Sequence, residues 1–223
     1  MINSVVIRDP RIDAAKIRKR GANPVNSNRV FQRVQYIIDD VGKRGDRAIF
    51  HYTKKLDGVE LKSLLVSSKE IEDAYANVSP KQVRSVRLIK ERLTRSEKTV
   101  LNHLFKEIKT VSNGITINRA VRPLRSVGCY IPGGKARYPS TAIMCIVPAK
   151  VAKVRRIVAI CPPLKDGSID PLTLVAADIC GATEFYKMGG AHGIAALALG
   201  TSTINKVDKI VGPGGTFTTA AKI

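Results

Sequence analysis

Tryptophan is absent from the 223 residues, and aromatic residues make up only 5% of them. Single-stranded nucleic acids bind largely by stacking bases on aromatic rings, so such platforms are scarce here. No run reaches the roughly 18 uninterrupted apolar residues of a membrane span. The N-terminal residues 1–13 also lack the charged-then-apolar layout of a signal peptide. We therefore expect a cytoplasmic protein with no membrane contact, for which nucleic acid is a disfavoured partner.

Metal-binding and redox motifs are missing as well. The chain has three histidines and four cysteines, and the cysteines lie singly in apolar runs with no Cys-x-x-Cys pair. This pattern favours buried free thiols over a structural zinc site. His51 and His103 lie in basic segments of helical pattern, and we expect them to be ordinary surface or core histidines far from any ligand loop.

Acidic residues are few beside basic ones, and the formal net charge is +20. Such a field attracts polyanions or anionic metabolites. The excess is spread along the chain, with +12 over residues 1–120 and +8 over residues 121–223. It therefore indicates a generally basic surface more than a dedicated stripe for nucleic acid.

The first half of the chain has a helical pattern over residues 1–110. Apolar residues in Val30–Val41 fall on one helical face. Ser67 and Glu70 have the spacing of a capping box. A proline in the first helical position opens a long basic helix over Pro80–Leu104.

The amino-acid composition changes in the second half of the chain, where 12 of the 17 glycines and 8 of the 11 prolines follow residue 120. Short apolar runs here predict strands at 126–131, 155–161, 184–188 and 206–211. Alanine-rich stretches predict helices at 139–152, 170–180 and 191–199, with a fourth starting near Thr216. Alternating strands and helices indicate a parallel sheet. We predict an α/β protein with a mainly helical region, an incomplete domain, over 1–125 and a Rossmann-like domain over 126–223.

Three glycine-bearing loops follow the predicted strands: Pro132–Lys135, Gly189–His192 and Gly212–Gly215. Glycine lets the backbone approach a phosphate closely, and free N–H groups at helix starts attract anions. None of the loops is a Gly-x-Gly-x-x-Gly fingerprint or a Walker motif. We expect them to form one rim that binds a nucleotide or a phosphate.

Several blocks of the chain resemble consecutive signatures of the histidinol dehydrogenase family. They are RPLRSVGCYIPGGKARYPSTAIM (122–144), VPAKVAKVRRIVAICPP (147–163), KMGGAHGIAALALGT (187–201) and KVDKIVGPGG (206–215), preceded by VGKRGDRAIFHYTKKLDGV (41–59). The resemblance extends from about Val30 to Ile223. It implies oxidation of an amino alcohol, L-histidinol, to histidine through an aldehyde. It also implies NAD as the oxidant, a zinc-dependent enzyme and a homodimer.

The resemblance assigns three positions to NAD binding. Tyr130 matches a tyrosine that contacts NAD. His192 stands where the family has a glutamine, and Gly215 where its Gly-Pro-Gly-Asn block has an asparagine. The family's zinc ligands and its glutamate-histidine base would follow Ile223, so no catalytic or metal residue is assigned. Two alternatives stay open: Tyr130 is only a strand-end aromatic packing on a helix, and His192 only opens a helix after Gly190.

Two other functions remain as alternatives. One is a truncated, non-catalytic paralogue that binds a nucleotide or polyanion through the basic charge. The other is a related zinc-dependent alcohol dehydrogenase with another substrate, because such enzymes share the Gly-Cys-Tyr and Gly-Pro-Gly blocks. In the reading that the resemblance favours, the helical region is an incomplete domain, and we expect its exposed apolar surface to favour dimerisation or aggregation.

Overall fold

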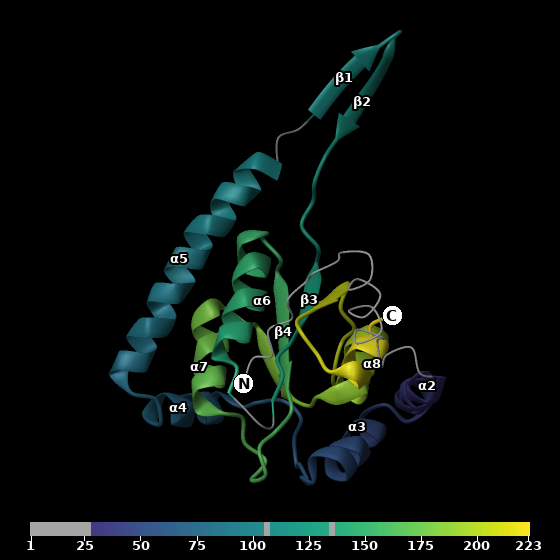
Figure 1. Cartoon of the computed structure of the whole chain (residues 1–223), viewed down its shortest axis with the longest axis vertical. Coiled ribbons are helices and arrows are strands. Elements are labelled where there is room, and N and C mark those ends of the chain that lie inside the picture. The colour runs from purple at the N-terminus through teal and green to yellow at the C-terminus, as the bar shows by residue number, and fades with distance from the viewer. Residues whose placement is uncertain (1–27, 105–107, 134–136) are drawn as a thin grey trace, which may run out of the picture.

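The structure, a computed structural model, describes residues 28–104, 108–133 and 137–223. Residues 1–27 of the predicted helical region lie outside the described residues. The first part is helical, as predicted (Figure 1). Its elements are α2 (Asn28–Arg44), α3 (Asp46–Tyr52), the π-helical turn η2 (Thr53–Asp57), α4 (Ser68–Ala76) and α5 (Pro80–Leu104). Within the described ranges, no helix combines the length and apolar character needed to cross a membrane.

The two helix starts predicted from capping residues are confirmed. At α4, the Ser67 hydroxyl accepts the Glu70 N–H at 3.2 Å, and the Glu70 carboxylate accepts the Ser67 N–H at 2.8 Å. Ser79 and Gln82 make the same reciprocal pair at the start of α5, at 3.3 and 3.0 Å. These pairs satisfy backbone donors that have no partner inside the helix. Local sequence therefore determines where both helices begin.

The prediction of helix up to residue 110 is wrong from Ile108 onward. β1 (Ile108–Ser112) and β2 (Ile115–Arg119) form an antiparallel hairpin that stands away from the rest of the chain (Figure 1). Asn113 and Gly114 join them with φ of 49° and 77°. Two positive φ angles define a type I′ turn, for which Asn-Gly is the preferred sequence. That dipeptide is the signal that could have located the hairpin.

The second part contains a four-stranded parallel sheet in the order β5-β4-β3-β6. The strands are β3 (Ser126–Tyr130), β4 (Arg156–Cys161), β5 (Glu184–Lys187) and β6 (Lys209–Val211). The helices are α6 (Pro139–Val151), α7 (Pro171–Cys180), α8 (Gly190–Leu199) and α9 (Thr216–Ala220). Every predicted strand and helix of this part is present, and the α/β fold class with a Rossmann-like sheet is confirmed.

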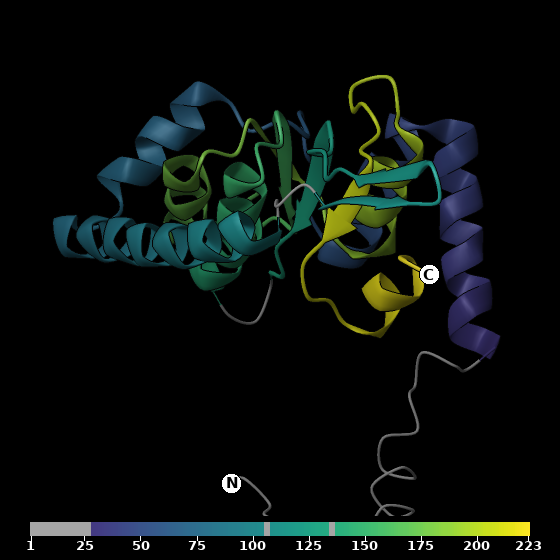
Figure 2. The same ribbon diagram turned by 90° about the horizontal axis from the view of Figure 1, so that it is seen from above.

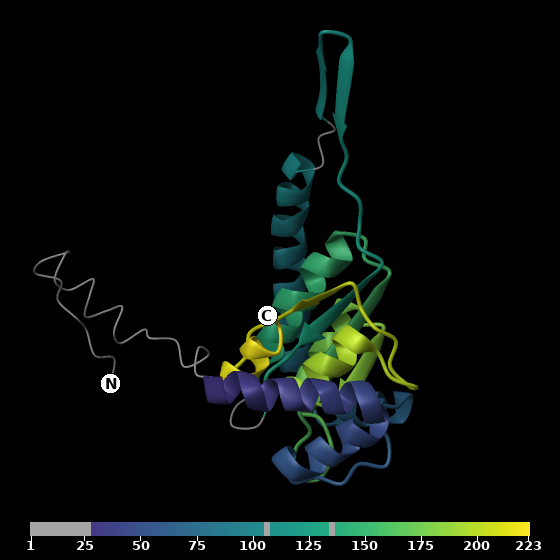
Figure 3. The ribbon, with the colours of Figure 1, turned by 90° about the vertical axis from the view of Figure 1, so that its right-hand side faces the viewer.

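Helices cover both faces of this sheet, because alternate strand residues point in opposite directions. In β4, Ile157 and Ala159 face α6 and α7, while Val158 and Ile160 face α8. α4 and α5 pack outside α6 and α7, and α2, α3 and α9 pack around α8 (Figure 2). Figure 3 shows α2 lying across the α8 side. Helices from the first half of the chain thus pack on both sides of the sheet, and the division at residues 125 and 126 stays a prediction.

Candidate functional site

The carboxyl ends of the parallel strands form the edge where ligands bind in such folds. From β3 the strands are added in one direction to β4 and β5, and the chain then returns to place β6 on the other side of β3. Ligands usually bind where the order reverses, here between β3 and β6. A Cβ on Gly212 would lie 2.1 Å from the carbonyl oxygen of Tyr130. Only glycine therefore lets the chain leave β6 so close to the end of β3.

Tyr130 ends β3, and only 6% of its surface is exposed. Its hydroxyl accepts from Thr218 Oγ1 at 3.5 Å and from the backbone N–H of Gly190. Burial raises the pKa of Tyr130, so the hydroxyl keeps its proton. The ring packs in the apolar cluster beside α8, and Lys222 Nζ lies 5.5 Å from its centroid. The ring of Tyr130 therefore contributes to apolar packing, while its hydroxyl links the start of α8 to α9.

His192 lies in the first turn of α8 and is 1% exposed. Burial lowers its pKa to about 4, so the imidazole is neutral at neutral pH. Its Nε2 lies 3.4 Å from Thr53 Oγ1, while its Nδ1 is buried without a hydrogen-bond partner. Buried polar atoms are nearly always paired in proteins. The unpaired Nδ1 is therefore a hydrogen-bonding group that the described residues do not use.

Gly215 is the residue that precedes α9, and it is exposed. A Cβ built on it meets no atom within 4 Å, and its φ of −71° suits any residue. The asparagine that the resemblance assigns to this position would therefore fit without strain. Because Thr218 of α9 contacts Tyr130, and Gly190 contacts Tyr130 from α8, the predicted positions gather at the starts of these two helices.

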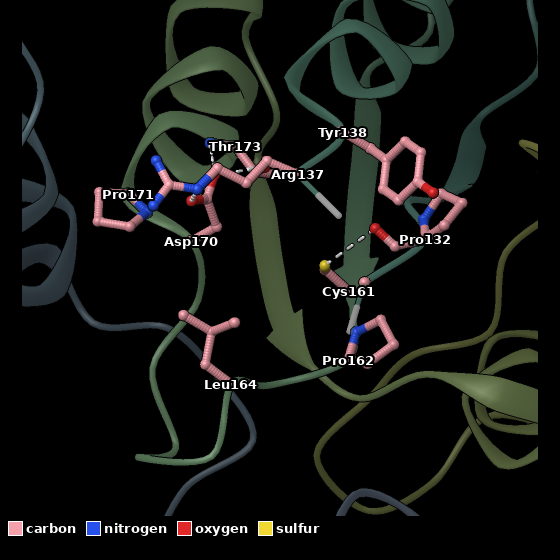
Figure 4. A pocket seen from close by; sticks show the side chains of 10 residues that line it. Pro132, Arg137, Tyr138, Cys161, Pro162, Leu164, Asp170, Pro171 and Thr173 are labelled. Carbon is pink, nitrogen blue, oxygen red and sulfur yellow. Dashed lines mark hydrogen bonds and ion pairs between the residues drawn. The ribbon is translucent and has the colours of Figure 1, made fainter. Parts of the chain in front are cut away.

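The predicted loop Pro132–Lys135 is described only as far as Gly133, and Gly134 and Lys135 lie outside the described residues. Its first residues border a pocket of about 230 Å³ (Figure 4). Across this pocket Arg137 Nε pairs with Asp170 Oδ1 at 3.1 Å, and Asp170 also caps α7. A Cβ on Gly133 would come within 3.0 Å of the Pro162 carbonyl oxygen. Glycine therefore keeps the ends of β3 and β4 close together.

A larger groove of about 570 Å³ lies beside the start of α8. Tyr36 of α2, Leu56 of η2 and Phe217 of α9 are among the side chains that line it. These three side chains are 70%, 57% and 42% exposed. Gly190 forms part of the floor, so the groove adjoins Tyr130 and His192. Exposed aromatic and aliphatic surface next to a helix N-terminus suits a flat heterocycle that carries an anionic group.

The cysteines and the other two histidines are not among the polar groups gathered at the start of α8. The prediction of free thiols is confirmed for all four cysteines, three buried and Cys145 partly so, and burial raises the pKa of Cys161 to about 12. His51 and His103 are exposed on helices, as expected. The expectation that His51 lies far from the loops needs correction, because the neighbouring Tyr52 ring is 6.0 Å from that of His192. Tertiary packing of α3 against α8 brings this segment to the site.

The sequence analysis missed two polar residues of the site, Thr53 and Asp57. Both lie in η2, and Asp57 Oδ2 is 4.0 Å from His192 Nε2. Burial raises the pKa of Asp57 to about 6, and its Oδ2 is buried without a hydrogen-bond partner. No local pattern marks these residues, because they become neighbours of His192 only through the packing of η2 against α8.

Comparison with known proteins identifies the family. A family model described as histidinol dehydrogenase matches residues 20–223. The chain belongs to the histidinol dehydrogenase family. The enzyme of Clostridium acetobutylicum is 43% identical over 221 residues, which are 97% of this chain and 50% of that protein. The enzyme of Methanocaldococcus jannaschii is 44% identical over 200 residues, 90% of this chain and 46% of that protein.

A solved structure agrees with the sequence relatives. Histidinol dehydrogenase from Elizabethkingia anophelis superposes with a TM-score of 0.79 at 36% identity, covering 86% of this chain and 44% of that one. The chain thus spans about half the length of the histidinol dehydrogenases it matches. The predicted family is confirmed.

Histidinol dehydrogenases generally use NAD and zinc. The residues present fit NAD: a buried unpaired nitrogen on His192, glycine backbone at the switch point and an apolar groove at a helix start meet at one edge. They do not fit zinc. In the described part of the chain, no group of three or more His, Cys, Asp or Glu side chains is arranged to hold a metal ion.

Proposed function

We propose that this chain is the NAD-binding part of a histidinol dehydrogenase, which oxidises L-histidinol to L-histidine through the aldehyde. The supporting observation is the gathering of Tyr130, His192 and the Gly215 turn at the starts of α8 and α9, in a chain of this family. The reaction places the protein in histidine biosynthesis.

Each part of the site has a separate role in this proposal. NAD, when bound, would supply a hydride acceptor for the substrate carbon. The N–H groups at the start of α8 would favour its phosphates, and the groove at Leu56 and Phe217 would hold a flat ring. The hydroxyl of Tyr130 and Nδ1 of His192 offer hydrogen bonds for orientation. Zinc and the base for the substrate hydroxyl are assigned to no described residue.

The proposal includes a homodimer. Apolar side chains on the β1–β2 hairpin are open to solvent, with Val111 at 64%, Ile115 at 65% and Ile117 at 55% exposed. Ile115 and Ile117 share one face of the hairpin, and Val111 lies on the other. Exposed apolar surface of this kind is a common property of subunit interfaces. The expected partner is a second copy of the chain.

Calorimetric titration of the chain with NAD tests the site. We expect binding that weakens roughly five-fold in Tyr130→Phe, because the substitution removes one hydroxyl at about 1 kcal/mol. Tyr75→Phe is the matched control, since Tyr75 donates to Asp178 Oδ2 at 2.7 Å on the opposite side of the sheet. Its affinity for NAD should equal that of the unaltered chain.

The same titration separates the competing functions. Absence of binding heat at millimolar NAD would remove the cofactor from the proposal. Salt-sensitive binding of random DNA that NAD does not affect would then favour the polyanion-binding paralogue.

A further inference from the structure

Three polar side chains meet beneath the first turn of α8: Thr53 and His192 are buried, and Asp57 is partly buried with its Oδ2 turned inward. Thr53 and Asp57 are the first and last residues of η2, and both approach Nε2 of His192. Nε2 lies 3.4 Å from Thr53 Oγ1 and 4.0 Å from Asp57 Oδ2. π-Helical turns are rare and occur frequently at functional sites. Here the turn brings a carboxylate and a hydroxyl to the same edge of one imidazole ring.

Few hydrogen-bonding or charged groups surround this cluster to pair with its polar atoms. Asp57 Oδ2 and His192 Nδ1 are both buried without a hydrogen-bond partner. The charged groups that face Asp57 are few: Lys165 favours its ionised form, and Lys165 Nζ donates to the Asp57 backbone oxygen at 3.1 Å. Tyr52 of α3 presents its ring to that of His192 at 6.0 Å between centroids. The negative charge of Asp57 also contributes to the raised pKa of Tyr130 and of Cys161.

The ionised carboxylate limits which ring nitrogen of His192 carries the proton. A carboxylate only accepts hydrogen bonds, and a neutral imidazole has one N–H and one bare nitrogen. A bare Nε2 facing Asp57 Oδ2 would set two lone pairs against each other, whereas an N–H there is attracted by both Asp57 and Thr53. The proton therefore belongs on Nε2, and the partner of one ring nitrogen decides the state of the other.

The other nitrogen faces the glycine loop. Nδ1 is the nearest atom to a Cβ built on Gly190, at 3.4 Å. Gly190 has a φ of 55° and lines the groove beside α8. Because Gly190 has no side chain, only backbone lies between the Nδ1 edge of the ring and the groove.

We propose that Asp57 is a positioning residue that holds the proton of His192 on Nε2, so that Nδ1 serves as a hydrogen-bond acceptor for a ligand hydroxyl or amide at the α8 groove. This inference rests on the proposed function only for the place of the ligand. When Asp57 itself takes up a proton, the negative charge that holds the ring proton on Nε2 is lost, and the proton moves to Nδ1. The site then presents a donor where it presented an acceptor.

Nitrogen NMR of the histidine rings tests this without any ligand. The chain has only three histidines, so His51→Gln and His103→Gln assign the spectrum. Between about pH 8 and about pH 5 we expect the His192 nitrogens to exchange roles while the ring stays neutral. Asp57→Asn, of the same size, should abolish this step. Flat His192 nitrogen shifts in the unaltered chain, or a step that persists in Asp57→Asn, would overturn the proposal.

Titration with NAD then tests the ligand part. We expect the His192 Nδ1 resonance to move when NAD binds, and NAD affinity to fall about five-fold between about pH 8 and about pH 5. Asp57→Asn should show no such fall in affinity. NAD binding that leaves Nδ1 unmoved would overturn the acceptor role while leaving the proposed function intact. Absence of NAD binding would count against the proposed function, and the ligand-free spectra would still decide the role of Asp57.

Discussion

The two faces of the parallel sheet differ in what they bury. The face under α6 and α7 is filled mainly by apolar side chains and thiols, and burial raises the pKa of Cys129 there, which keeps the thiol neutral. Its few buried polar groups are paired, Thr173 with Asp170 and Lys187 with Glu70. The face under α8 buries His192 among its aliphatic residues, and Nδ1 of this ring has no partner. One face therefore pairs its buried polar groups, and the other leaves polar atoms unpaired next to the carboxyl edge.

This difference shows on which face the fold loses stability in order to keep polar groups for a ligand. An unpaired polar atom in the interior costs about 1–3 kcal/mol. His192 Nδ1 and Asp57 Oδ2 are two such atoms, and both lie on the α8 side. Among the described residues, only Asp46 Oδ1 joins them as a buried side-chain atom without a partner. The α6 and α7 face therefore serves mainly to stabilise the sheet, and the α8 face carries the candidate site.

The largest expected effect comes from matched core truncations on the two faces. Ile143 of α6 and Ile194 of α8 are 1% and 0% exposed. Replacement of either by alanine should lower the free energy of unfolding by about 3 kcal/mol, measured by urea denaturation. Only Ile194→Ala should also weaken NAD binding, because α8 carries His192 and Gly190. Equal loss of NAD affinity in both variants would remove the functional contrast between the faces.

A second effect is expected from the pH dependence of stability. Because the folded pKa of His192 is about 4, below its ordinary value of 6.5, the unfolded chain binds more protons between these values. The contribution of His192 to folding stability is therefore fully present above about pH 6.5 and is lost as the pH falls toward 4, by about 3 kcal/mol. His192→Gln should lack this loss in urea denaturation followed from neutral to acidic pH. His103→Gln, a substitution of an exposed histidine, should retain it.

The smallest expected effect restores a family residue at the edge of the site. Gly215→Asn should raise NAD affinity about five-fold, since the amide adds one hydrogen bond of about 1 kcal/mol. The position is open, with no atom within 4 Å of a Cβ. Gly215→Ala controls for the loss of glycine and should leave affinity unchanged. A gain shared by both variants, measured by calorimetry, would locate the effect in backbone entropy instead of the amide.

Much of the fold could be predicted because its signals are local. Ser67 with Glu70 marked the start of α4, and the apolar runs around Tyr130 and Ile160 marked buried strands. The hairpin was not predicted, although Asn113 and Gly114 form its turn. The helical pattern over residues 1–110 overlaps the beginning of β1. The Asp57 contact with His192 could not be predicted, since 135 residues separate the two along the chain.

The sequence by itself determined the order of strands and helices, the family and the three candidate positions Tyr130, His192 and Gly215. Periodicity, caps and glycine turns depend on residues a few positions apart, so they can be recognised in the sequence. Only the tertiary structure decided that α3 and η2 pack on α8, and that Asp57 and Thr53 therefore meet the buried ring of His192. Burial changes the proton affinity of a side chain through its whole surroundings, and those surroundings exist only after folding.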